Sequence, residues 1–124
     1  MKNIKFIKTP CDALAVVLTA KESGACCEGT NKKLVANTTD AVTEKHVPEV
    51  TVNGDVVDVV VGSVEHPMLD NHYIEFIALE TDKGVHVRVL HPGEKPAASF
   101  VVKDEKPVAV YEYCNLHGLW VKII

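Results

Sequence analysis

The chain has 124 residues, which is enough for one main domain with a small appendage. Hydrophobic residues make up 47% and charged residues 24%, and no apolar run approaches the length of a membrane span. Thirteen basic and seventeen acidic residues give a formal net charge of -4 with no long run of either sign, so we expect neither nucleic acid nor a membrane as a partner.

The first segment, residues 1–36, carries two strand-like runs, IKFIK and LAVVLTA, followed by a turn cluster that holds Cys26 and Cys27. A unit this small usually needs a metal, a disulfide or a partner subunit to stay folded. Pro10 and Asp12 interrupt the apolar residues, so the segment lacks the continuous core of a signal peptide. We therefore expect a small β domain here and a cytoplasmic location for the protein.

A polar connector, NTTDAVTEK, leads into the main domain, which we place at residues 37–124. From Val47 onward, short runs rich in β-branched and aromatic residues are separated by turn signals such as Asn53-Gly54. This pattern predicts an all-β, antiparallel sandwich. The seven runs are VPEVTV, VVDVVVGSV, HYIEFIAL, VHVRVL, ASFVV, VAVYEY and LWVKII.

Two of the six histidines have settings typical of surface residues. His86 alternates with three valines, so we expect His86 and Arg88 to face solvent while the valines face the core. His91 lies in a His-Pro-Gly-Glu turn and can face water without cost. We expect no role in a functional site for His86 or His91.

The other four histidines and one cysteine lie at predicted strand ends and loops. Cys114 and His117 are three residues apart, a spacing that lets one loop wrap two ligands around a metal. His66 and His72 flank a short loop that can bring the second imidazole back near the first, and His46 ends the polar connector. Each fragment is a weak signal alone, but together they indicate a metal site.

These motifs resemble the superoxide reductases, the family that includes desulfoferrodoxin and neelaredoxin. The resemblance covers about residue 44 to the C-terminus and rests on three blocks in order: EKHVP, then HPM with HYIE, and finally CNLHGLW. It implies an immunoglobulin-like seven-stranded sandwich that binds one mononuclear non-haem iron. The implied ligands are four equatorial imidazoles and one axial thiolate, from His46, His66, His72, His117 and Cys114.

The resemblance also implies the chemistry: an enzyme that detoxifies superoxide by reducing it with one electron to hydrogen peroxide. Lys45 would attract the anionic substrate and help to supply protons, and Glu44 would bind the open position of the resting ferric iron. The Cys114 thiolate would donate electron density along the axis. A rubredoxin-like electron donor and a homodimer are further implications.

The N-terminal segment departs from the family pattern. In desulfoferrodoxin this segment resembles desulforedoxin and binds a second iron through four cysteines. Here the resemblance matches Cys11, Cys26 and Cys27 to three of them and places Lys8 where the first should be. Protonated lysine has no lone pair to offer a metal. We expect the second iron site to be absent, which leaves one iron per chain.

Two other classes of function are considered. A cupredoxin-like electron carrier is also a β-sandwich with a C-terminal Cys and a nearby His, but such sites usually place a methionine shortly after that His. The chain has only Met1 and Met68. A non-catalytic metal-binding module with an immunoglobulin-like fold is the second alternative, and only the joint spacing of the ligands weighs against it.

Overall fold

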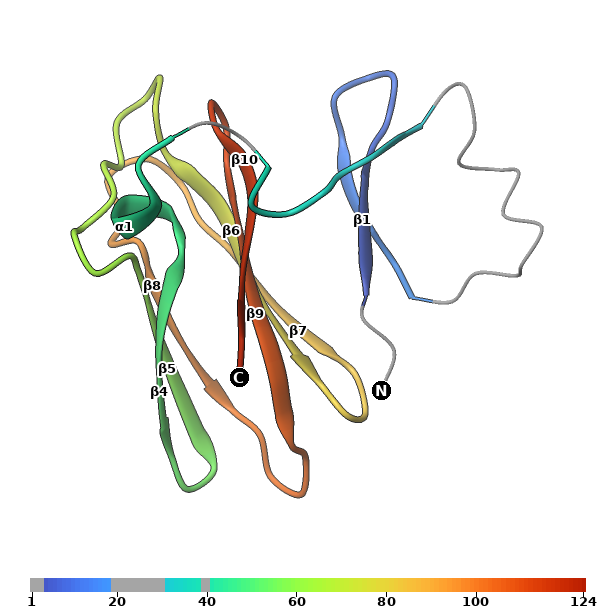
Figure 1. Cartoon of the computed structure of the whole chain (residues 1–124), viewed down its shortest axis with the longest axis vertical. Coiled ribbons are helices and arrows are strands. Elements are labelled where there is room, and N and C mark those ends of the chain that lie inside the picture. The colour runs from blue at the N-terminus through green and yellow to red at the C-terminus, as the bar shows by residue number, and fades with distance from the viewer. Residues whose placement is uncertain (1–3, 19–30, 39–40) are drawn as a thin grey trace. The chain divides into compact units, whose positions relative to one another are not determined.

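In the computed structural model, residues 4–18, 31–38 and 41–124 are described, and the chain divides into two compact units between Val35 and Ala36. The described part of the N-terminal unit contains a three-stranded antiparallel sheet in the order β2-β1-β3 (Figure 1). Its strands are β1 (Lys5–Lys8), β2 (Leu14–Val17) and β3 (Lys32–Lys33). The expected small β unit is therefore present.

The described residues of the incomplete cysteine site lie around the turn between β1 and β2. The exposed thiol of Cys11 is 3.2 Å from the Thr9 hydroxyl oxygen. Lys8 ends β1, and its ammonium pairs with the Asp12 carboxylate at 3.6 Å. Cys26 and Cys27 lie outside the described residues.

Residues 41–124 form the sandwich, which consists of a short helix and seven strands in two antiparallel sheets (Figure 1). The four-stranded sheet has the order β10-β9-β6-β7, and the three-stranded sheet has the order β4-β5-β8. The prediction of a seven-stranded, antiparallel, all-β sandwich is confirmed. The elements are α1 (Thr43–His46), β4 (Pro48–Asn53), β5 (Val56–Val61), β6 (Ile74–Thr81), β7 (Val85–Val89), β8 (Ala97–Val101), β9 (Pro107–Cys114) and β10 (Gly118–Ile123).

The core lies between the two sheets and follows from strand alternation. In β5, Val57, Val59 and Val61 are buried, while the side chains between them face outward or are only partly covered. Side chains of β6, β8 and β9 join them in one hydrophobic cluster. The predicted hairpin joins β4 to β5, but its two turn residues are Gly54 and Asp55, one position later than expected, because Asn53 still pairs with Val56. Gly54 takes the left-handed φ of 59° that this turn needs.

The expected orientation of β7 is wrong. His86 pairs with Leu79 of β6, so it shares the core face, and its ring packs edge-to-face against Phe100 at 6.2 Å. Val87 and Val89 are instead 51% and 61% exposed on the outer face. Alternation in an edge strand defines two faces but does not say which one the second sheet covers.

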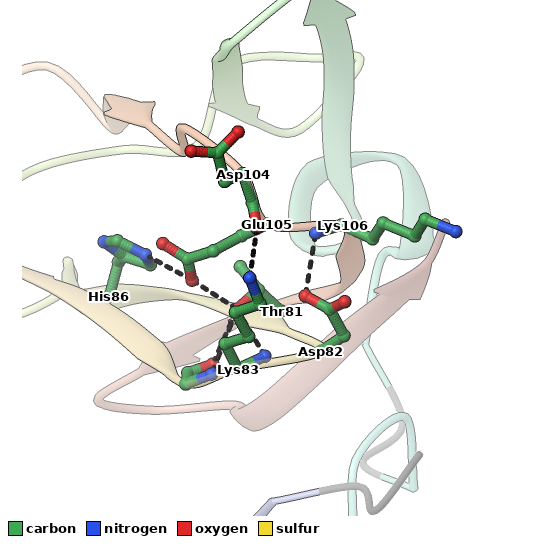
Figure 2. Close-up of polar contacts among 8 residues, drawn as sticks. Thr81, Asp82, Lys83, His86, Asp104, Glu105 and Lys106 are labelled. Carbon is green, nitrogen blue, oxygen red and sulfur yellow. Dashed lines mark hydrogen bonds and ion pairs between the residues drawn. The ribbon is translucent and has the colours of Figure 1, made fainter.

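Figure 2 shows how the turn between β6 and β7 is tied to the segment before β9. The Glu105 carboxylate accepts a hydrogen bond from the Thr81 hydroxyl at 2.6 Å and lies 3.3 Å from His86 Nε2. These contacts, the Thr81 hydroxyl first, lower the pKa of Glu105. Because β6 begins beside Cys114 and ends at Thr81, this network lies at the far end of the sheet from Cys114. It fixes a corner of the sandwich.

Candidate metal centre

Four histidines and one cysteine converge at one end of the sandwich. One ligand atom from each lies within 4.8 Å of every other. They come from the end of α1, the loop between β5 and β6, the end of β9 and the turn before β10. The structure thus brings together all five side chains that the sequence motifs singled out: His46, His66, His72, Cys114 and His117.

His46 is held by its other ring nitrogen. Its Nδ1 lies 2.7 Å from the Val42 carbonyl oxygen, and because a carbonyl can only accept, Nδ1 carries the proton. The Nε2 atom therefore presents a lone pair to the cluster. The Trp120 indole stacks on the His46 ring at 4.9 Å and donates from Nε1 to the His117 carbonyl at 3.1 Å. Trp120 thus contacts the His46 ring and holds the backbone at His117.

His66 has the same arrangement, because its Nδ1 donates to the Pro67 carbonyl at 2.7 Å. Its Nε2 then faces the Nε2 of His46 at 3.2 Å, with a lone pair on each atom. Two lone pairs at this distance repel unless a cation lies between them. This contact is a direct sign that the site is built for a metal ion.

His72 and His117 complete the ring of imidazoles. The Nε2 of His72 is buried and lacks a hydrogen-bond partner among the described residues, as expected for a nitrogen reserved for a metal. His117 turns Nδ1 inward, at 3.1 Å from His46 Nε2 and 3.8 Å from Cys114 Sγ. Gly118 follows with a left-handed φ of 79°, which lets the chain turn directly into β10.

Cys114 is fully buried beneath these rings. Burial raises the pKa of its thiol, the backbone N–H groups of Leu116 and His117 lower it, and the charges of Glu112 and Glu75 raise it again by smaller amounts. The two N–H groups stabilise a sulfur anion, although desolvation outweighs them in the metal-free protein. A cation at the centre would supply the charge that holds the thiolate.

Burial also disfavours the charged form of three of these histidines. Desolvation is the largest cause that lowers the pKa of His46, His66 and His72, and it brings the pKa of His66 to about 4. Neutral imidazoles offer lone pairs at physiological pH, and nitrogen with a single thiolate suits a transition metal such as iron. The described ligand cluster contains no carboxylate. Chemically, the donor set fits iron.

Glu44 and Lys45 lie exposed in α1, directly before His46. The charge of Lys45 contributes to the lowered pKa of both His46 and His72, so its ammonium acts on the centre electrostatically. The Glu44 carbonyl accepts hydrogen bonds from the Val64 N–H at 3.0 Å and the Ser63 hydroxyl at 3.2 Å. These bonds fix the backbone of α1 against the loop after β5.

Comparison with known proteins agrees with this geometry. The desulfoferrodoxin family model matches residues 38–122. The chain belongs to the desulfoferrodoxin family. It is 52% identical to desulfoferrodoxin from Clostridium acetobutylicum over 88 residues, which cover 71% of this chain and 69% of that protein. It is 44% identical over 105 residues to a desulfoferrodoxin homolog from Archaeoglobus fulgidus, covering 85% of this chain and 83% of the homolog.

Solved structures of family members have the same fold. The superoxide reductase from Treponema pallidum matches 98% of this chain and 99% of its own, with 36% sequence identity and a TM-score of 0.80. The one-iron superoxide reductase from Giardia intestinalis is also 36% identical, with a TM-score of 0.57, and covers 65% of this chain and 97% of its own. The match to the Giardia intestinalis protein covers a share of this chain about as large as the sandwich unit.

Sequence motifs missed the residues that support the ligands. Trp120 lies three residues after His117, and Gly62 lies four residues before His66, but neither spacing indicates a contact with a particular ring or turn. The cupredoxin alternative gains no support, because Met68 Sδ accepts a hydrogen bond from the Ile74 N–H at 3.3 Å. That methionine supports the loop through this bond.

Proposed function

We propose that this protein is a superoxide reductase, which reduces superoxide by one electron to hydrogen peroxide at a single mononuclear iron. The observation that carries the proposal is the convergence of four imidazoles and one buried thiol, with ligand atoms within 4.8 Å of one another. Family membership and the names of the solved relatives point to the same activity. When bound, the iron supplies the single electron and an open position for a small anion.

The proposed ligands are the nitrogens that the structure turns inward and the sulfur beneath them. His46, His66 and His72 would bind through Nε2, since Nδ1 of the first two is occupied by carbonyl groups. His117 would bind through Nδ1, which already lies 3.8 Å from the Cys114 sulfur. Cys114 would hold the iron through its sulfur, with the Leu116 and His117 N–H groups limiting the basicity of its thiolate.

Lys45 and Glu44 are proposed to act at the mouth of the centre. Lys45 places a positive charge near His46 and His72 in a protein whose net charge is -4, so it would attract superoxide against the overall field. The same ammonium would hold water that donates protons to the developing product. Glu44, one residue further from His46, would be an additional iron ligand in the resting ferric protein.

One iron per chain is proposed, because Lys8 stands where the first of the four cysteines of an N-terminal site should be. Its ammonium pairs with Asp12 at 3.6 Å and cannot serve as a ligand while protonated. We propose that residues 1–36 form a desulforedoxin-like domain without its iron and that residues 37–124 form the catalytic domain. Iron analysis should return one iron per chain; two irons with a tetrathiolate spectrum would contradict this count.

The remaining proposals concern partners and location. A rubredoxin-like protein would donate the electron in the cytoplasm. Among the described residues, no helix is long and apolar enough to cross a bilayer. For the homodimer, support comes from the edge strand β7, where Val87 and Val89 are both more than half exposed. Sedimentation analysis should give twice the chain mass; a monomer would contradict the homodimer.

The activity is tested by pulse radiolysis of the reduced, iron-loaded protein. Superoxide should oxidise the iron rapidly, and each superoxide consumed should yield one hydrogen peroxide without oxygen evolution. Oxygen evolved in the ratio expected for dismutation, or iron that stays reduced, would overturn the assignment. Adding an excess of a chemical reductant should make the reaction catalytic.

A further inference from the structure

The two loops that carry His72 and Cys114 meet where regular strand pairing stops. Strands β6 and β9 pair as far as Ile74 with Cys114, and the next residues outward are Tyr73 and Asn115. The Asn115 N–H donates to the Tyr73 carbonyl at 3.1 Å, as a ladder would require. The Tyr73 N–H, however, donates to Oδ1 of the Asn115 side chain at 2.9 Å. An amide side chain thus replaces a backbone carbonyl.

The other end of the same amide is also used. Nδ2 of Asn115 donates to the Asn71 carbonyl at 3.1 Å. Asn71 and Tyr73 are the two residues that flank His72, and Asn115 directly follows Cys114. The Asn115 side chain therefore hydrogen-bonds to both neighbours of the proposed ligand His72. Its backbone is bonded directly to the proposed ligand Cys114.

We propose that Asn115 is a positioning residue that sets the placement of the Cys114 sulfur relative to the His72 imidazole at the metal centre. This inference rests on the proposed metal-binding function. Both ends of the Asn115 amide are bonded to backbone, to the Tyr73 N–H and the Asn71 carbonyl. Its effect would pass through the two loops.

The orientation of the loop after Cys114 gives this placement its chemical consequence. The backbone N–H groups of Leu116 and His117, which hydrogen-bond to the Cys114 sulfur, belong to the two residues that follow Asn115. A loop that rotates when its amide anchor is lost would move the sulfur, the two donors and the His117 ring together. Outer partners of this kind typically change metal affinity by about 10- to 100-fold.

The test uses anaerobic titration of the full-length, metal-free protein with Co²⁺, whose thiolate charge-transfer band reports the sulfur ligand directly. Asn115→Ala removes both side-chain bonds. Asn115→Asp keeps the acceptor for the Tyr73 N–H but sets a carboxylate against the Asn71 carbonyl, so it tests the second bond with little change in shape. Thermal unfolding of each metal-free variant measures the purely structural effect.

Asn37 provides a matched control in the same unit. Its Oδ1 accepts from the Val121 N–H at 2.9 Å and its Nδ2 donates to the Val121 carbonyl at 3.3 Å, so it also uses both ends of its amide on backbone. Its φ of 61° is one that glycine adopts freely. Asn37→Gly therefore removes two equivalent bonds without strain, on strand β10 and not on the loops that carry His72 and Cys114.

We expect both Asn115 variants to weaken Co²⁺ binding about 10-fold or more and to shift the charge-transfer band. Asn37→Gly should lower the unfolding temperature while leaving affinity and band unchanged. If Asn115→Ala does not fold, Asn115→Asp decides the question. Asn115→Asp with wild-type affinity and band would overturn the positioning role. Wild-type protein that binds Co²⁺ without a thiolate band would instead refute the proposed metal centre.

Discussion

Replacing Gly62 with alanine should displace the short helix that carries Glu44, Lys45 and His46. A Cβ atom at Gly62 would lie 2.6 Å from the Glu44 carbonyl oxygen, 2.9 Å from the Val47 carbonyl oxygen and 3.0 Å from the Lys45 carbonyl carbon. All three atoms belong to backbone, so no flexible side chain can move aside. The absence of a side chain at Gly62 is what lets α1 approach the loop after β5.

The size of the displacement follows from these distances. Ordinary van der Waals contact begins at about 3.4 Å, so the Glu44 carbonyl must retreat by about 0.8 Å, the difference between 3.4 and 2.6 Å. Overpacking of this kind typically costs about 1 to 3 kcal/mol of stability. Misplacement of catalytic groups by about 1 Å can cost on the order of 100-fold in rate. Because α1 carries both a proposed ligand and the proposed substrate-attracting lysine, affinity and rate should both fall.

The assay combines urea unfolding of the metal-free protein with pulse radiolysis of the iron-loaded protein. Gly62→Ala should lose about 1 to 3 kcal/mol and react with superoxide roughly 10- to 100-fold more slowly. Gly84→Ala is the control, since a Cβ there meets nothing within 4 Å and its φ lies outside the left-handed range. That variant should keep wild-type stability and rate. Wild-type rate and stability in Gly62→Ala would refute the packing argument.

Three further predictions concern charge. Lys45→Ala should slow the reaction with superoxide by about threefold to tenfold and flatten its dependence on ionic strength, whereas Lys45→Arg should retain both; an unchanged rate in Lys45→Ala would contradict the steering role. The metal-free protein should lose up to about 3 kcal/mol from His66 as pH falls from 6.5 toward 4, because the unfolded chain takes up a proton there first. His66→Gln should reduce this slope in urea unfolding, and an unchanged slope in that variant would contradict the assignment. Burial raises the pKa of Glu112 well above its usual range, so ionisation of this carboxyl opposes folding as pH rises above about 4. The stability gained by Glu112→Gln should therefore grow between pH 5 and pH 8. A gain that does not depend on pH would show that Glu112 is not the titrating group.

The sequence predicts the sandwich and the five clustered side chains because their signals are local. Short β-branched runs with a turn at Asn53-Gly54 indicate hairpins, and the ligands fall in compact blocks such as that from Cys114 to His117. Each block needs only its own loop to place its side chains. Family resemblance then joins the blocks into one centre.

Features that depend on contacts between distant segments were not predicted. The register of the whole sandwich decides which face of β7 meets the second sheet. The alternation in the sequence therefore assigns His86 to the solvent face, although it lies on the core face. Trp120 stacks on His46, and α1 packs closely against Gly62. Both contacts join residues that are far apart in sequence. The sequence motif contains Asn115, but nothing in the motif indicates that its amide hydrogen-bonds to both neighbours of His72.

The proposed ligand set is tested most directly by X-ray absorption spectroscopy of the reduced, iron-loaded protein beside its Cys114→Ser variant. The wild-type iron should show one sulfur and four imidazole nitrogens, and the variant should lose the sulfur while keeping the nitrogens. A wild-type iron surrounded by nitrogen and oxygen alone, by several sulfurs, or by a sulfur that persists in the variant would contradict the proposed centre.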